Sequence, residues 1–155
     1  MTDYQVIHFA CHGLLDENFP FRSALVLSKG NKEEEDGFFQ VREIYNLKMN
    51  AEMIVLSACQ TGRGKLEHGE GVLGLPRIFF YTGAQSVLTS LWRIHDKSTS
   101  KFMNLFYEYL FQGYGKAQAL RLAKLKMMKS RFSHPHYWAA FVLNGDFSTS
   151  LVPKK

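Results

Sequence analysis

Short apolar runs typical of β-strands recur along the chain, and each is followed by turn residues or by a stretch with helical periodicity. Residues 5–10, 53–57 and 85–92 are rich in β-branched and aromatic side chains. Residues 53–57 are apolar at nearly every position, which is typical of a strand buried on both faces of a parallel sheet. A further run at residues 138–144 predicts a last strand near the end of the chain.

Helical periodicity is clearest in the second half of the chain. Amphipathic helices are predicted at residues 98–111 and 115–131, with shorter helices at 41–47 and 72–82 and with Gly83 as a helix cap. Residues 23–28 and 38–41 predict a hairpin around a charged turn. Strands that alternate with helices in this way indicate an α/β fold with a mainly parallel sheet and helices on its faces.

Composition places the chain in the ordinary globular class. It has 155 residues, of which 46% are hydrophobic and 21% charged, enough for one domain with a real core and too apolar for disorder. The longest apolar runs are far shorter than the ~20 residues of a membrane span, and the first residues carry no basic segment typical of a signal peptide. Two cysteines are too few for a disulfide scaffold, so we expect reduced thiols and a cytoplasmic location.

The net charge of +5 raises the question of an acidic partner. Its basic residues cluster at helical spacing, in Lys116, Arg121, Lys124, Lys126, Lys129 and Arg131. One interpretation is a solvated helix face, and the other is a surface for nucleic acid. No nucleic-acid motif accompanies the cluster, so we favour the solvated face and expect neither a nucleic-acid nor a membrane partner.

Two chemically reactive side chains follow neighbouring strands of the predicted sheet. His12 comes after the strand at residues 5–10, and Cys59 comes after the strand at 53–57. Ligands of parallel α/β sheets bind at the carboxyl ends of the strands, so these two groups could be a nucleophile and its base. The backbone N–H groups of Gly13 and Cys59 are candidate oxyanion donors.

A structural interpretation of the same residues stays open at this point. Cys59 could be a buried cysteine that ends a core strand, and His12 an unrelated turn histidine. Cys11 points to the face opposite its neighbour His12 and suits a core thiol. We expect His8 to be buried and hydrogen-bonded. His134 and His136 could bind a metal, but no further ligand cluster accompanies them, and a turn or packing role is favoured.

Asp96 follows the strand at residues 85–92 and so also falls at a carboxyl strand end. It could be an N-cap or first-turn acid that favours the helix dipole. It could also form the floor of a pocket for a basic side chain before a scissile bond. Glu70, in the glycine-rich segment after Cys59, could contribute to the same pocket.

Several motifs in order resemble the CHAT domain, a caspase-like cysteine protease family related to separase, caspases and gingipains. They are HFACHG at 8–13, LSACQTG at 56–62, the segment 69–99, FYEYL at 106–110 and HPHYWAAFVLNGD at 134–146. The resemblance implies a caspase-like three-layer sandwich over residues 1–147, with a tail at 148–155. It also implies a Cys59–His12 dyad that hydrolyses peptide bonds without metal or organic cofactor. Pro76 departs from the small residue that is usual in the family's helix.

Family members begin with further strands before the histidine strand, whereas this chain starts almost on it. We therefore expect the sheet to lack its N-terminal strands and the strand at residues 5–10 to lie at an exposed edge, which favours self-association. The resemblance implies a cysteine endopeptidase acting on proteins or peptides within a regulated complex, with tetratricopeptide repeats or a partner chain nearby. The alternative is a catalytically inactive CHAT-like interaction or scaffold module.

Overall fold

A four-stranded sheet forms the centre of the protein in the computed structural model, which describes residues 4–14, 16, 18–31, 36–57 and 77–151. Its order is β1 (Val6–Phe9), β5 (Met53–Leu56), β6 (Ser86–Ser90) and β7 (Phe141–Gly145). Strands β1, β5 and β6 pair in parallel, and β7 pairs with β6 in the antiparallel direction. The mainly parallel sheet predicted from the apolar runs is confirmed.

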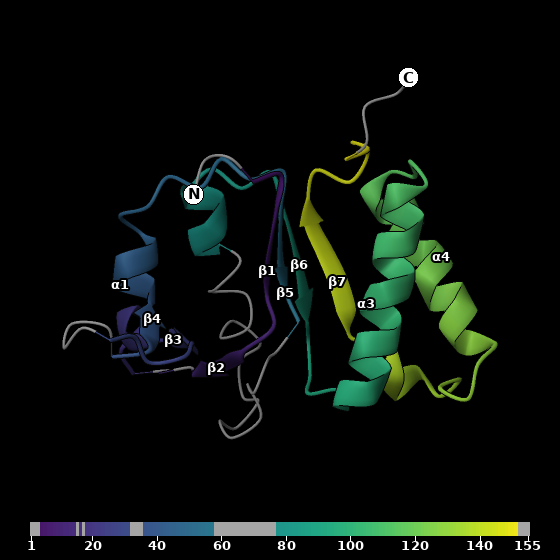
Figure 1. Cartoon of the computed structure of the whole chain (residues 1–155), viewed down its shortest axis with the longest axis horizontal. Coiled ribbons are helices and arrows are strands. Elements are labelled where there is room, and N and C mark those ends of the chain that lie inside the picture. The colour runs from purple at the N-terminus through teal and green to yellow at the C-terminus, as the bar shows by residue number, and fades with distance from the viewer. Residues whose placement is uncertain (1–3, 15, 17, 32–35, 58–76, 152–155) are drawn as a thin grey trace.

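Helices and a second sheet cover the two faces of the central sheet, which gives three layers (Figure 1). On one face, α3 (Asp96–Phe111) and α4 (Lys116–Met128) enclose a core in which the Phe102 ring stacks on Phe141 with centroids 4.0 Å apart. On the other face, α1 (Val41–Ile44) and helical residues 77–81 enclose a second core. The expected caspase-like sandwich is confirmed.

Successive side chains of β1 point to opposite faces of the sheet and pack into both of these cores. Val6 packs against the core under α3 and α4, whereas Ile7, Phe9 and Cys11 belong to the core on the other face. Strand β5 is buried at all four positions, as its uninterrupted apolar run predicts. The central strands thus contribute to both cores at once.

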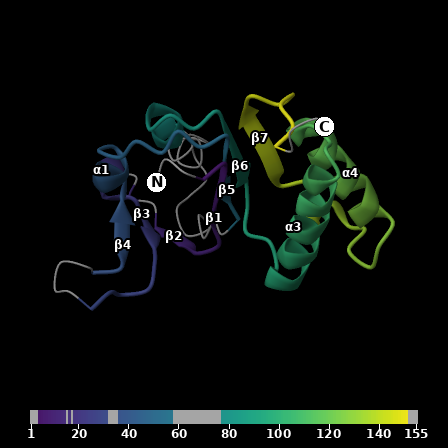
Figure 2. The ribbon, with the colours of Figure 1, turned by 45° about the horizontal axis from the view of Figure 1, so that its top comes forward.

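A small antiparallel sheet lies apart from the central one (Figure 2). It contains β2 (His12–Leu14), β3 (Ala24–Val26) and β4 (Phe38–Gln40), in that order. The predicted hairpin is the β3–β4 pair. Strand β2 was not predicted, because three residues with glycine in the middle carry no apolar run; the chain bends at Cys11 and enters the second sheet.

The last strand begins later than the sequence pattern predicts. Residues Pro135–Tyr137 form the 3₁₀ turn η2, and the N–H of Trp138 closes this turn on the carbonyl of Pro135. Strand β7 therefore starts only at Phe141. The predicted cap at Gly83 is confirmed: its φ of 98° follows helical residues 77–81, and its N–H donates to the Phe80 carbonyl.

Lys116 corrects the prediction of a uniformly solvated basic helix. Its side chain is 0% exposed, and the ammonium donates to the carbonyl of Glu52 at 3.0 Å and to Asp146 at 3.2 Å. This ion pair joins the start of α4 to the segments before β5 and after β7. A buried ammonium needs such partners because desolvation of an unpaired charge is costly. In the part of the chain that is described, no helix combines the length and apolar character needed to span a bilayer.

Strand β1 is one of the two edge strands of the central sheet in the described structure, and β7 is the other. The N–H of Met53 donates to the carbonyl of Gln5, and that of Ser57 donates to the carbonyl of Phe9. Because alternate residues of a parallel strand bond to the same neighbour, the backbone groups of Val6 and His8 point away from β5. An edge of this kind is a template for another strand.

We expect the isolated chain to self-associate through β1, and light scattering at micromolar concentration measures this. Ile7→Lys should shift the chain toward monomer, as should Val6→Pro, which removes an outward N–H and leaves the ladder to β5 intact. Val142→Lys on the opposite edge strand is the matched control, and circular dichroism checks that each variant folds. A monomer that is indifferent to all three changes would contradict the prediction.

Candidate active site

The three parallel strands all finish at the same end of the central sheet, so their carboxyl ends lie side by side. In register, Phe9 of β1 lies beside Leu56 of β5, and Leu56 lies beside Thr89 of β6. The chain leaves β1 toward His12 and leaves β6 toward Asp96, the first residue of α3. Figure 1 shows β2 and the start of α3 at this same end of the sheet. The fold therefore gathers the segments that carry the candidate residues.

His12 is the first residue of β2, and its side chain is exposed. Its cross-strand partner is Val26 of β3, while the buried Gly13 pairs with Leu25. The pairing of β2 with β3 holds the His12 backbone within a ladder rather than in a free turn. The alternative interpretation placed His12 in a turn, and this location is wrong because His12 lies in a strand.

Cys59 and Glu70, the other residues predicted for the site, lie outside the described residues. The Cys59–His12 distance and the donor roles of the Gly13 and Cys59 N–H groups therefore stay predictions. Leu56 ends β5, so Cys59 follows the middle strand of the three by three positions in the sequence.

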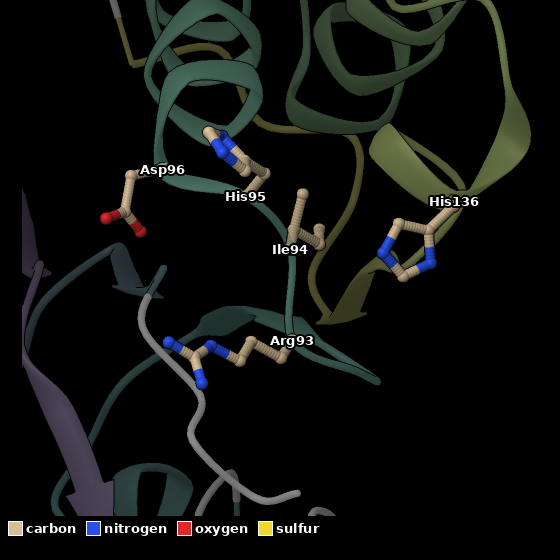
Figure 3. A pocket seen from close by; sticks show the side chains of 5 residues that line it. All are labelled: Arg93, Ile94, His95, Asp96 and His136. Carbon is tan, nitrogen blue, oxygen red and sulfur yellow. The ribbon is translucent and has the colours of Figure 1, made fainter.

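Asp96 lines an open pocket of about 390 Å³ at the end of β6. Arg93, Ile94 and His95 line it from the segment between β6 and α3, and His136 lines it from η2 (Figure 3). Asp96 is exposed and stands in the first turn of α3, where its charge favours the helix dipole. The pocket has mixed charge, because the guanidinium of Arg93 shares it with the carboxylate.

A chain of three hydrogen-bonded side chains lies near the carboxyl ends of these strands, on the face of the sheet that α3 covers. His8 Nε2 is 2.7 Å from Ser57 Oγ, and His8 Nδ1 is 3.0 Å from the Tyr107 hydroxyl. Ser57 directly follows β5, and Tyr107 comes from the middle of α3. The hydrogen bonds predicted for His8 are present, but the residue is exposed rather than buried.

The motifs noted in the sequence extend over most of the chain, and comparison with known proteins identifies the family to which they belong. The family model of the CHAT domain matches residues 1–146. This chain belongs to the CHAT domain family. It is 35% identical over 104 residues to tetratricopeptide repeat protein 28 of Homo sapiens, and the aligned part is 66% of this chain and 4% of that protein. The protein of the same name from Mus musculus is 33% identical over the same length, again 4% of the relative.

His8, the middle member of this chain, and Tyr107 are both neutral at pH 7 in this CHAT domain. Although His8 is exposed as a whole residue, partial desolvation of its imidazole between Ser57 and Tyr107 lowers its pKa below the ordinary value. Burial raises the pKa of Tyr107 to about 12. A neutral imidazole has one donor and one acceptor nitrogen, so it can satisfy Ser57 and Tyr107 in either tautomer. Protonation would remove the acceptor nitrogen, so one of its two partners would have to change from donor to acceptor.

No local pattern in the sequence singles out Ser57, Tyr107 or the pocket residue Arg93, and the sequence predicted His136 only as a metal ligand or a turn residue. The alternation of β1 offered one signal, because it places His8 on the same face as Val6. Nothing local pairs His8 with Tyr107, which lies 99 positions away. His134, weighed as a metal ligand, instead accepts a hydrogen bond from the His136 N–H at 3.2 Å and so supports η2.

The His8 chain should make the stability of the domain depend on pH. The folded state holds the pKa of His8 below 6.5, so it binds fewer protons than the unfolded state as pH falls through that value. Stability should therefore be lost on going from pH 7.5 to 5.5, as measured by urea unfolding. His8→Asn should flatten this dependence, whereas His95→Asn, at an exposed helix start, should not.

Tyr107→Phe tests the hydrogen bond itself, because it keeps the ring and removes the hydroxyl. At pH 7.5 it should lower the free energy of unfolding by about 1 kcal/mol. For the pH test with His8→Asn described above, an equal pH dependence of unfolding in the wild type and in the variant would show that His8 does not titrate differently on folding.

Proposed function

We propose that this CHAT domain is a cysteine endopeptidase that uses Cys59 and His12. The observation that carries the proposal is the placement of His12 and of the Asp96 pocket beside the carboxyl ends of β1 and β6, on either side of β5. Cys59 follows Leu56 by three positions in the sequence, and three residues of chain span at most ~10 Å. In this proposal the thiol follows β5, the strand between the histidine strand and the pocket strand.

The chemistry follows from these roles. The Cys59 thiolate attacks the scissile carbonyl carbon, and the N–H groups of Gly13 and Cys59 stabilise the oxyanion that forms. His12 donates a proton to the leaving amine as the C–N bond breaks, which leaves an acyl group on sulfur. The neutral His12 then accepts a proton from water as the water oxygen attacks the thioester. The C–S bond breaks to give the carboxylic acid and the Cys59 thiolate beside a protonated His12, which restores the starting state.

Specificity in this proposal comes from the pocket at the end of β6. Asp96 is exposed to the pocket and favours a basic side chain before the scissile bond, with Glu70 as a second acid. Arg93 lines the same pocket and opposes a cationic substrate. The proposed preference for Arg or Lys is therefore the net result of two opposite charges.

A second candidate function is a catalytically inactive interaction module. The edge strand β1, with the backbone groups of Val6 and His8 directed outward, favours it, because such an edge accepts a strand from a partner. The relatives that align with 104 residues of this chain are named for tetratricopeptide repeats. We propose that such repeats or a partner chain regulate the domain, in the cytoplasm. The presence of both His12 and Cys59 favours the peptidase.

Reaction with a peptidyl electrophile separates the two functions. A Cys59 thiol paired with His12 should be alkylated far faster than Cys11, and mass spectrometry of the labelled peptide locates the site. Cys59→Ala should abolish peptide cleavage, and His12→Ala should lower kcat/KM by at least about a hundredfold, the usual range for a lost general acid. Cys11→Ala is the matched control. Cleavage that persists in Cys59→Ala would rule out the dyad.

Profiling of a peptide library tests the pocket. The wild type should cleave after Arg or Lys, and Asp96→Asn should lower kcat/KM for these substrates roughly tenfold to a hundredfold, as expected for a lost charged hydrogen bond. Arg93→Gln should act in the opposite direction, because it removes the competing cation. A preference for Asp before the scissile bond would contradict the assignment.

A further inference from the structure

A row of side chains crosses the small sheet directly beside His12. In register, His12 of β2 lies opposite Val26 of β3, and Val26 lies opposite Phe38 of β4. Residues opposite one another in an antiparallel sheet point to the same face. His12, Val26 and Phe38 therefore form one row on a single face of the sheet, and Leu14 lies on that face two residues along β2.

The opposite face of the small sheet belongs to the core. Gly13 and Leu25 are buried, and Leu25 and Phe39 pack with the core that includes Phe79. The His12 face is therefore the face opposite this core. Ala24, which lies on it between Leu14 and Gln40, is buried, whereas His12, Leu14 and Phe38 at its margins are exposed. Phe38 is 42% exposed and Leu14 is 48% exposed, so large apolar side chains stand on this face next to a polar histidine. Exposed apolar groups gathered in this way mark an interaction surface.

The chemistry of peptide hydrolysis indicates what this surface would bind. A general acid must lie within hydrogen-bond reach of the leaving nitrogen. The residue that follows the scissile bond carries this nitrogen, so that residue must lie beside His12. The Asp96 pocket lies at the end of β6, whereas His12 follows β1, and β5 separates the two strands. The side of the substrate that precedes the bond and the side that follows it are thereby assigned to opposite sides of β5.

We propose that Val26 and Phe38 of this row, together with Leu14 on the same face, bind apolar side chains of the substrate in the first few residues after the scissile bond. The proposal rests on the peptidase function proposed above. Adjacent strands are about 4.8 Å apart, so Phe38 lies about 10 Å from His12, a distance that an extended peptide spans in about three residues. The substrate class is a protein cleaved before an apolar segment.

The test compares two kinds of substrate with the same basic residue before the cleaved bond. Peptides extended beyond the bond contact the row, whereas a fluorogenic amide with no amino acid after the bond does not. Among extended peptides, the wild type should prefer Leu or Phe over Gly or Asp in the first three positions after the bond, by about tenfold in kcat/KM. The kcat/KM of the wild type for the fluorogenic amide is the reference value, because this substrate does not reach the row.

Phe38→Lys should abolish this preference and should favour acidic residues after the bond, while cleavage of the fluorogenic amide stays within about twofold. Phe21→Lys is the matched control, because Phe21 is 64% exposed and lies in the turn η1 (Pro20–Arg22), outside the row. It should leave both activities unchanged. Thermal unfolding of each variant shows that it is folded.

The outcomes separate the inference from the function on which it rests. If neither substrate is cleaved and Cys59 does not react with a peptidyl electrophile, the peptidase function itself is wrong. If both are cleaved but Phe38→Lys leaves the preference after the bond unchanged, the row does not bind substrate. A change in oligomeric state on Phe38→Lys without a change in preference would assign the row to a second copy of the chain and would overturn the proposal.

Discussion

Parallel pairing of β1, β5 and β6 is the constraint on which the rest of the structure depends. Parallel strands run in the same direction, so all three end at one edge, with Phe9, Leu56 and Thr89 in adjacent register. Parallel strands also need a crossover connection between them. The described helices of these connections, α1 and residues 77–81, lie on one face of the sheet, and α3 and α4, which lead from β6 to the antiparallel β7, cover the other. The buried positions of β5 and β6 follow from this arrangement.

The same constraint places the candidate site and the Lys116–Asp146 ion pair at opposite ends of the sheet. Lys116 and Asp146 join α4 to the end of β7, and the ammonium also binds the carbonyl of Glu52, just before β5 begins. This lies at the end of the sheet opposite the strand ends that lead to His12 and Asp96. The Lys116–Asp146 pair can therefore hold α4 in place without a charge at the candidate site.

The Ser57–His8–Tyr107 chain links three elements that meet beside the candidate site. It joins the edge strand β1 to the residue after β5 and to the middle of α3. Strand β1 is paired in the central sheet with β5, so side-chain hydrogen bonds to α3 add a second constraint on it. Because the His8 imidazole stays neutral and serves both partners, the chain needs no buried charge.

The sequence by itself determined the parts of the fold that depend on local pattern. The apolar run of residues 53–57 predicted a central strand, because a strand covered on both faces has no polar side. The periodicity of residues 98–111 predicted α3, and the positions of His12 and Asp96 after strands placed them at strand ends. The motif set also identified the CHAT family, which the family match confirmed.

Only the tertiary structure decided which distant segments pair. Strand β2 entered a second sheet, β7 took the antiparallel direction, and Lys116 was buried against Asp146. None of these has a local signal, because periodicity reports how a segment is covered and not which segment covers it. The contact of His8 with Tyr107 has the same origin: two residues 99 positions apart meet because packing of α3 on the sheet brings them together.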